Sequence, residues 1–251
     1  MDNLKNILIN LKNMGATGIK ISFEDEGALY NEVITMRNLT ADVGMELSIK
    51  IGGCEAKRDI VDCMDINCNA IVAPMVETNF ALTKFIKSLE CYNYNKIKGF
   101  NLETIQAYNN LHSIDLSVVD FVTFGRVDFV SSMNLDRTSV DTDSILSMAI
   151  NIFTKARASS VKCYLGGAIS INSKGFINKL IELGLLDKFE TRYIIYDTNL
   201  IDITKFEELI YWGNVFEVEW LKFINQRYMM HANKDVKRIR MIEDRIKINK
   251  Q

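Results

Sequence analysis

Proline is almost absent from this chain, since Pro74 is the only one among 251 residues. No Pro-rich or Ser-rich stretch occurs before about residue 200, so nothing there is typical of a linker between domains. Apolar residues make up 48% of the chain, which is enough to build one large core. We therefore expect one domain at residues 1–200 and a separate C-terminal segment at residues 201–251.

Other missing features exclude whole classes of protein. The five cysteines are odd in number and have no C-x-x-C spacing, which argues against a disulfide framework and a zinc site. The formal net charge is −2 and no long basic run precedes the last predicted helix, which argues against nucleic-acid binding. No apolar run is long enough to span a bilayer, and residues 1–14 lack the apolar core of a signal peptide. We expect a cytoplasmic protein that binds neither nucleic acid nor a membrane.

Histidine is also scarce. His112 and His231 are the two in the chain, and neither lies in a recognisable site motif. We therefore expect other side chains to carry any acid–base chemistry.

Short β-branched runs alternate with amphipathic stretches along the first 200 residues. The predicted strands are 18–23, 46–51, 69–73, 96–102, 120–124, 161–165 and 192–196. The predicted helices are 4–14, 31–43, 54–66, 78–89, 105–111, 143–158 and 173–183. Strands joined by crossover helices form a parallel sheet, and so many such units favour a closed TIM-type α/β barrel over an open sheet. The pattern contains seven strands rather than the eight of a complete barrel.

Two acidic residues follow neighbouring predicted strands. Glu103 comes directly after the strand 96–102, and Asp128 lies just beyond the strand 120–124. Because the C-terminal ends of barrel strands meet at one mouth, these carboxylates are expected to converge where a hard divalent cation could bind. Alternatively, each acid caps the helix that follows its strand, since carboxylates favour helix N-termini.

Five short motifs occur in order between residues 15 and 197. They are 21–25 (ISFED), 49–53 (IKIGG), 71–78 (IVAPMVET), 102–104 (LET) and 125–129 (GRVDF). In order and spacing they resemble the 2-oxoacid aldolases and citrate lyase β subunits, the metal-dependent members of the phosphoenolpyruvate/pyruvate barrel superfamily. The resemblance implies that Glu103 and Asp128 hold Mg²⁺ or Mn²⁺. It also implies a carbon–carbon lyase or aldolase that acts through an enolate of a 2-oxoacid or a related acyl substrate.

The sequence departs from the family pattern at two positions. Lys50 stands where the family has an arginine that grips the substrate carboxylate, and a compact ammonium cannot reproduce that two-pronged geometry. Lys50 could instead act as a Schiff-base lysine. Asp25 stands where some family aldolases have an acid–base histidine, so it is a candidate base.

Arg126 either contacts a substrate carboxylate in place of the absent arginine or is a solvated loop charge.

Two glycine pairs are candidates for substrate binding. Gly166 and Gly167 follow a predicted strand, where backbone N–H groups could approach an anion, although a tight turn explains the same pair. Gly52 and Gly53 have the same two readings and fall in the family's substrate-binding turn. The substrate expected from the resemblance is a small anionic oxoacid or acyl compound.

The resemblance also indicates that the family's first strand is missing here. The chain begins with a predicted helix, so the barrel either has a gap or is patched by the C-terminal segment, since unpaired backbone groups at a seam are unfavourable. The missing strand and the lysine at position 50 favour an alternative, a barrel that serves as a binding or assembly module. Another is a lyase for phosphorylated or CoA-linked substrates.

From about residue 204 the chain is predicted to form two or more long helices. Apolar residues crowd the first part of this segment: Phe206, Leu209, Ile210, Phe216, Val218, Trp220, Leu221 and Phe223. So much apolar surface on an appendage indicates docking between subunits, and we expect a homo-oligomer. The mixed charges of residues 233–250 are typical of a solvated amphipathic helix.

Overall fold

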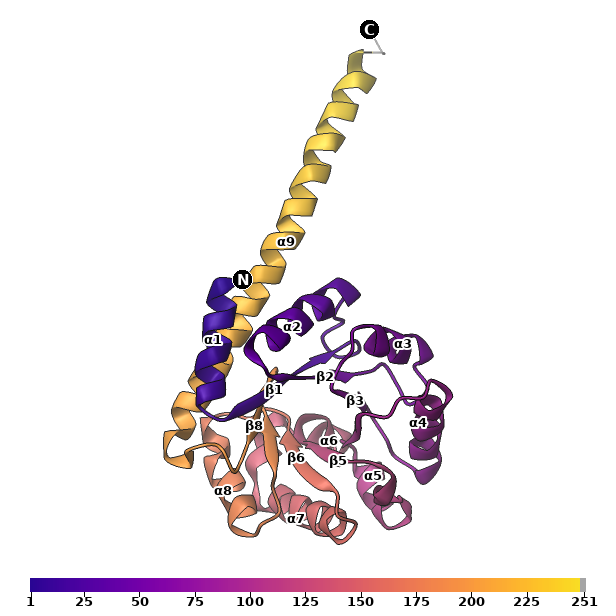
Figure 1. Cartoon of the computed structure of the whole chain (residues 1–251), viewed down its shortest axis with the longest axis vertical. Coiled ribbons are helices and arrows are strands. Elements are labelled where there is room, and N and C mark those ends of the chain that lie inside the picture. Colours follow the sequence, from indigo (N-terminus) through magenta and orange to yellow (C-terminus); the bar gives the residue numbers. More distant parts are fainter. Residues whose placement is uncertain (249–251) are drawn as a thin grey trace.

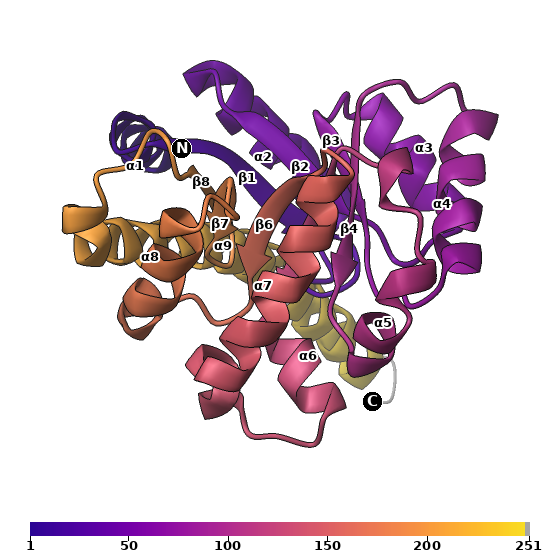
Figure 2. The ribbon, with the colours of Figure 1, turned by 90° about the horizontal axis from the view of Figure 1, so that it is seen from below.

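The computed structural model describes residues 1–248, and within them eight strands form a closed barrel in the order β1 to β8 (Figures 1 and 2). The strands are β1 (Ala16–Ser22), β2 (Glu46–Lys50), β3 (Ala70–Ala73), β4 (Ile97–Leu102), β5 (Phe121–Gly125), β6 (Lys162–Gly166), β7 (Lys188–Glu190) and β8 (Ile194–Asp197). The predicted TIM-type barrel with a helical C-terminal extension is therefore confirmed.

Helices surround the barrel. They are α1 (Asp2–Asn13), α2 (Tyr30–Val43), α3 (Lys57–Asp65), α4 (Asn79–Cys91), α5 (Ile105–Asn109), α6 (Arg126–Ser132), α7 (Asp143–Ala158), α8 (Lys174–Glu182) and α9 (Phe206–Ile248). Short 3-10 turns lie at Leu111–Ser113, Leu116–Val118, Arg137–Asp141, Ile171–Ser173 and Ile203–Lys205. The predicted helices match these bounds closely, except that the short helix α6 was missed.

The strands are apolar on the side that faces the helices, and this pattern builds the main core. In β1, for example, Ile19 and Ile21 are buried in that core, whereas Lys20 between them lines the mouth of the barrel. Side chains alternate between the two faces of a strand, so every second residue points into the barrel. The polar residues of the strands therefore collect in its interior.

A second, small apolar cluster fills the interior below the mouth. It consists of Ala70, Val72, Phe121 and Tyr164, and the last two rings stack with their centroids 4.3 Å apart. Gly99 makes room for it, because a Cβ there would lie 2.4 Å from the ring of Phe121. The barrel is thus packed at its base and polar at its mouth.

The seam of the barrel is closed in a way that the sequence did not predict. The strand predicted at 192–196 is β8, but it runs antiparallel to both of its neighbours, β7 and β1. Only three residues, 191–193, join β7 to β8, and such a connection makes a hairpin because a parallel crossover needs a dozen or more residues. The expected gap is therefore absent within residues 1–248, and the C-terminal segment does not supply the closing strand.

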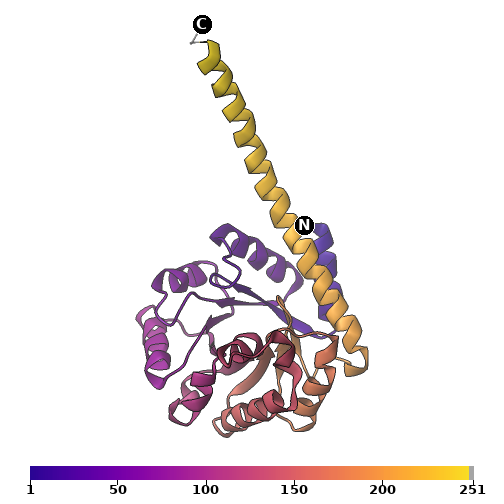
Figure 3. The same cartoon turned by 180° about the vertical axis from the view of Figure 1, so that it is seen from behind.

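The C-terminal extension is one helix of 43 residues, so the prediction of two or more helices was wrong. Its first part packs on the barrel, where Phe206, Phe216 and Trp220 are buried. It lies beside α1, and the rest of the helix projects away from the barrel (Figures 1 and 3). Most of the apolar cluster that indicated docking between subunits is thus covered by the chain's own barrel. Among the residues that the structure describes, no helix is both long and apolar enough to cross a membrane.

Phe216 should anchor α9 to the barrel. Its side chain is fully buried, so Phe216→Ala is expected to lower the free energy of unfolding by about 3 to 5 kcal/mol. Met230→Ala, on the same helix but 60% exposed, should change it by less than about 0.5 kcal/mol. Urea denaturation followed by circular dichroism measures both, and equal effects of the two variants would contradict the described packing.

Candidate active site

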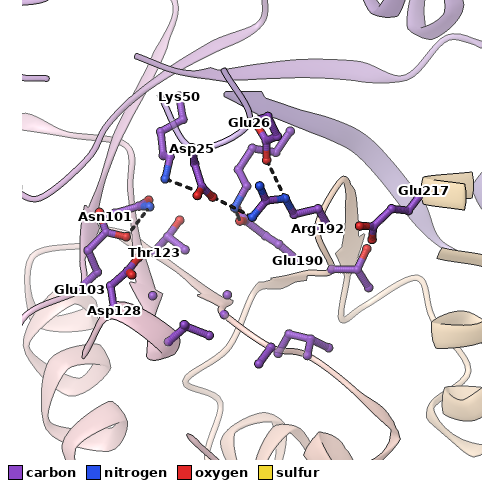
Figure 4. A pocket seen from close by; sticks show the side chains of 18 of the residues that line it. Asp25, Glu26, Lys50, Asn101, Glu103, Thr123, Asp128, Glu190, Arg192 and Glu217 are labelled. Carbon is purple, nitrogen blue, oxygen red and sulfur yellow. Dashed lines mark hydrogen bonds and ion pairs between the residues drawn. The ribbon is translucent and has the colours of Figure 1, made fainter. Parts of the chain in front are cut away.

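A cavity of about 480 Å³ opens at the mouth of the barrel (Figure 4). The ends of most strands and one turn of α9 contribute to its walls. The charged residues that line it are Lys20, Asp25, Glu26, Lys50, Glu103, Asp128, Arg137, Glu190, Arg192 and Glu217. It therefore brings together Glu103, Asp128, Lys50 and Asp25, four of the residues predicted for the site.

Glu103 is held in place by two hydrogen bonds. One carboxylate oxygen accepts from the backbone N–H of Met75 at 2.8 Å, and the other accepts from the side-chain amide of Asn101 at 3.0 Å. Met75 directly follows the single proline and has a left-handed backbone (φ 50°), at the turn that carries this N–H. Gly125 is needed beside it, because a Cβ there would lie 2.8 Å from Glu103 Oε2. Glu103 does not cap the following helix; the hydroxyl of Thr104 does.

Asp128 lies in the first turn of α6, so the N-terminal dipole of that helix also favours its carboxylate. The two acids follow the neighbouring strands β4 and β5, and Asp128 raises the pKa of Glu103. Burial is the largest cause that raises the pKa of Glu103, and the nearby Lys50 ammonium opposes it. Desolvation likewise raises the pKa of Asp128, again against Lys50. Two carboxylates that repel each other at a cavity wall make a site that favours a cation.

Lys50 is buried, with its ammonium 3.0 Å from Glu24 and 3.8 Å from Asp25. Burial alone would lower the pKa of this lysine, but the carboxylates of Glu103, Glu24 and Asp25 outweigh burial and raise it. The amine is therefore protonated at neutral pH. A Schiff-base lysine must lose its proton before it attacks a carbonyl, so this environment disfavours that role and favours a fixed positive charge.

Arg126 does not reach the cavity. Its guanidinium is fully buried, forms an ion pair with Asp141 and donates to the carbonyl of Gly167 at 2.9 Å. Further donor contacts reach Ser173 Oγ at 3.3 Å and the carbonyl oxygen of Gly166 at 3.3 Å. Neither sequence interpretation, a substrate contact or a solvated loop charge, describes this position, because the guanidinium is buried against the carbonyls of the loop after β6. Arg126 ties the loops after β5 and β6 together.

The two glycine pairs, which the sequence left between substrate binding and tight turns, lie in different surroundings. Gly166 and Gly167 line the cavity, and a Cβ on Gly167 would lie 2.7 Å from the backbone nitrogen of Arg126, so this loop packs against the start of α6. Gly52 and Gly53 are not among the residues that line the cavity. The N–H of Gly52 instead donates to Asp59 at 2.6 Å, which ties the turn to α3.

Several residues of the cavity were not predicted from the sequence. Lys20 of β1 forms an ion pair with Glu190 of β7, and Arg192 pairs with Asp25 at 2.8 Å and Glu26 at 3.0 Å. The alternation of strand residues could have found Lys20, a lysine between two buried isoleucines. Glu190 and Arg192 belong to the β7–β8 hairpin, and β7 is only three residues long. A strand of three residues gives too weak a signal to find Glu190. Arg192 begins the predicted strand 192–196, but the structure places it in the turn between β7 and β8.

Two further oxygens lie unused beside the acid pair. Asn101 Oδ1 and Thr123 Oγ1 are buried and have no hydrogen-bond partner among residues 1–248. Both residues line the cavity next to Glu103 and Asp128. Buried polar atoms are rarely left without a partner, so oxygen atoms of this kind indicate a place for a bound water, ion or ligand.

This donor set fits a hard divalent cation that keeps open coordination positions. Two carboxylates with neighbouring amide and hydroxyl oxygens are oxygen donors of the kind that Mg²⁺ and Mn²⁺ prefer. No cluster of three or more His, Cys, Asp or Glu side chains suited to a metal occurs within the described part of the chain. Glu103 and Asp128 would supply two charged ligands to such an ion, with the remaining positions open to water or substrate.

Known structures share this fold. An HpcH/HpaI aldolase from Desulfitobacterium hafniense DCB-2 has a TM-score of 0.59 and 13% identity, covering 71% of this chain and 79% of that one. Citrate synthase SbnG has a TM-score of 0.58 and 14% identity, covering 74% and 89%. An HpcH/HpaI aldolase/citrate lyase family protein from Burkholderia cenocepacia J2315 has a TM-score of 0.57 and 12% identity, covering 74% and 91%. No protein-family model and no curated protein sequence matches the chain.

At such identities these likenesses establish the fold and no more. The chain has the barrel fold of the HpcH/HpaI aldolase structure and of the aldolase/citrate lyase family structure. The resemblance found in the five sequence motifs is thereby confirmed for the architecture. Activity, metal and substrate need a separate argument.

Arg126 and Arg137 offer a direct test of which arginine supports the fold. Arg126→Gln removes a buried charge from its partners and should lower the free energy of unfolding by about 3 to 5 kcal/mol. Arg137→Gln changes an exposed arginine at the rim and should lower it by less than about 0.5 kcal/mol. Chemical denaturation compares the two, and a fully stable Arg126→Gln protein would contradict the structural role.

Proposed function

We propose that this barrel is a carbon–carbon lyase or aldolase that uses Mg²⁺ or Mn²⁺ and acts through an enolate of a 2-oxoacid or a related acyl substrate. One observation carries the proposal: two carboxylates from adjacent strand ends, Glu103 and Asp128, share one cavity wall with unpartnered oxygens. A pure scaffold gains nothing from holding like charges together. The fold shared with HpcH/HpaI aldolases supports the same reading.

The chemistry of such a reaction needs positive charge where an enolate oxygen develops. A divalent cation, when bound by Glu103 and Asp128, would supply most of that charge. Lys50 supplies a second, permanent charge beside it, since its neighbours keep the ammonium protonated. In our proposal this ammonium binds the carboxylate of the oxoacid and orients the substrate toward the acid pair.

A proton must also move when the carbon–carbon bond breaks or forms. Asp25 lies at the mouth of the cavity, half exposed and held by Arg192 at 2.8 Å. It is the candidate to accept or donate that proton in place of a histidine, since neither His112 nor His231 lines the cavity. The N–H groups of the loop at Gly166 and Gly167 border the same space and are candidates to contact an anionic substrate.

Metal binding by the acid pair can be measured without knowing the substrate. Calorimetric titration of Mn²⁺ into metal-stripped protein should show one site, and Glu103→Gln and Asp128→Asn should each weaken it at least about tenfold. Glu217→Gln is the matched control, because Glu217 lines the same cavity from α9 and is assigned no metal. Unchanged affinity in both acid variants, or no binding to the wild type, would remove the metal from the proposal.

Enolate formation can be measured without knowing the second substrate. In D₂O with Mg²⁺, the wild type should exchange the methyl protons of pyruvate faster than Mg²⁺ alone, as followed by loss of the methyl NMR signal. Asp128→Asn should slow the exchange about 100-fold or more, because charge stabilisation at the oxyanion is lost. Lys50→Met should slow it as well.

The two measurements separate the alternatives. Metal binding without any exchange would contradict pyruvate-type chemistry and favour an acyl substrate such as a CoA-linked or phosphorylated compound. The absence of both would favour a barrel that serves as a binding or assembly module.

A further inference from the structure

The distal half of α9 extends beyond the barrel. The last side-chain hydrogen bonds from α9 to the rest of the described chain are donated by Arg227 to Thr35, at 3.2 Å, and by Tyr228 to Glu32. From residue 229 to residue 247 every side chain is exposed, except that Met241 is half-buried. Figures 1 and 3 show this part as a rod that leaves the barrel next to α2.

A solvated rod of this kind is not stabilised by the fold itself. At 1.5 Å per residue it is roughly 28 Å long, and in proteins most helical stability comes from the packing of an amphipathic face rather than from helix propensity. Residues 229–247 have no such packing within the part of the chain that the structure describes. A second surface that covered their apolar side chains would therefore stabilise this part of the helix.

The rod carries one continuous apolar stripe. Its members are Met229, Ala232, Val236, Ile239, Ile242 and Ile246. Their steps of three, four, three, three and four residues are close to the spacing of a coiled-coil seam. Val236, Ile239 and Ile246 are 43%, 53% and 51% exposed, which is unusual for isoleucine and valine in a monomer. Most of the remaining positions of the rod are charged or polar.

We propose that the distal half of α9 forms a parallel, in-register coiled coil with a second copy of this chain. In this arrangement Met229 and Val236 occupy one seam position, and Ala232, Ile239 and Ile246 occupy the other. A second copy of the chain requires no other protein as a partner. A two-fold axis brings the apolar stripe of one copy against the same stripe of the other.

The charges beside the stripe favour a parallel arrangement. In a parallel coiled coil, a residue that flanks the seam on one helix faces the residue five positions later on the other helix. Asp235 of each copy therefore lies opposite Arg240 of the other copy. In an antiparallel coiled coil, the flank of the seam that carries Arg240 and Lys247 would face the same flank of the second copy. The positive charges of the two copies would then lie close together. Ile242, next to the seam, would lie against the aliphatic stem of Lys247.

The acidic residues argue against a lipid surface as the occupant. Asp235 borders the stripe, and Glu243 falls on the seam itself, where an anionic membrane would repel both carboxylates. In the parallel arrangement Glu243 faces Glu243 of the second copy, and this one repulsive pair weakens the last turn of the seam, as a single polar residue in a seam is tolerated at a cost in stability. The stripe thus fits a second helix of the same sequence.

Light scattering after size exclusion tests the association on the full chain. The wild type should have a mass of at least two chains at micromolar concentration, and Ile239→Asp should reduce it to one chain. Met230→Asp is the matched control, since Met230 is 60% exposed and lies off the stripe, and its mass should equal the wild type's. A monomeric wild type, an unchanged mass for Ile239→Asp, or equal loss in both variants would overturn the proposal. A wild type that stays monomeric but sediments with phosphatidylserine vesicles would assign the stripe to a membrane.

Charge reversal tests the orientation. Asp235→Arg should shift dissociation to at least about tenfold higher concentration, and Asp235→Arg/Arg240→Asp should restore the wild-type behaviour. A double variant as weak as the single one would contradict the parallel register. Neither measurement depends on metal or substrate, so it can fail without affecting the proposed activity.

Discussion

Closure of the barrel by an antiparallel strand is the constraint on which the rest of this structure depends. A barrel has no free edge, so a strand must fill the seam between β7 and β1, and backbone donors and acceptors would otherwise stay unpaired. The β7–β8 hairpin fills it within ten residues, from Lys188 to Asp197. Because β8 runs against its neighbours, the hairpin turn rather than a strand end lies at the mouth. The hydroxyl of Tyr196 then donates to the carbonyl of Leu209 at 2.7 Å, which fixes the start of α9.

This closure also sets the charges of the cavity. The hairpin brings Glu190 and Arg192 to the side opposite the acid pair, where each binds a residue of β1 or of the loop after it. Lys20 and Arg192 are thereby neutralised by internal partners. On the other side, the ammonium of Lys50 favours the charged forms of both Glu103 and Asp128, and Arg137 also favours that of Asp128, but Lys50 is itself engaged by the loop at residues 24–25. The excess negative charge of the cavity is thus concentrated where the unpartnered oxygens lie.

The architecture could be predicted because its signals are long and regular. Six of the seven predicted strands lie where parallel strands are found, and the seventh is real but reversed. Direction could not be predicted, since β7 has three residues and its strand signal merges with the following turn. The placement of the two acids at the mouth could be predicted because the motifs put Glu103 directly after one strand and Asp128 just beyond the next. Arg126 could not be assigned, because only the packing of the loop after β6 shows that its guanidinium points away from the mouth. The C-terminal segment was correctly predicted to be helical, although it forms one helix and not two or more. Most of its apolar cluster is buried on the chain's own barrel, and sequence does not distinguish such burial from burial on a second copy.

The account as a whole depends on a metal between two particular carboxylates. Anomalous diffraction from crystals grown with Mn²⁺ and oxalate, a planar dianion that resembles the enolate of pyruvate, locates the ion directly. We predict one anomalous peak within coordination distance of both Glu103 and Asp128, with the oxalate on the side of Lys50. A peak at other residues, or oxalate bound with no metal beside the acid pair, would contradict the account.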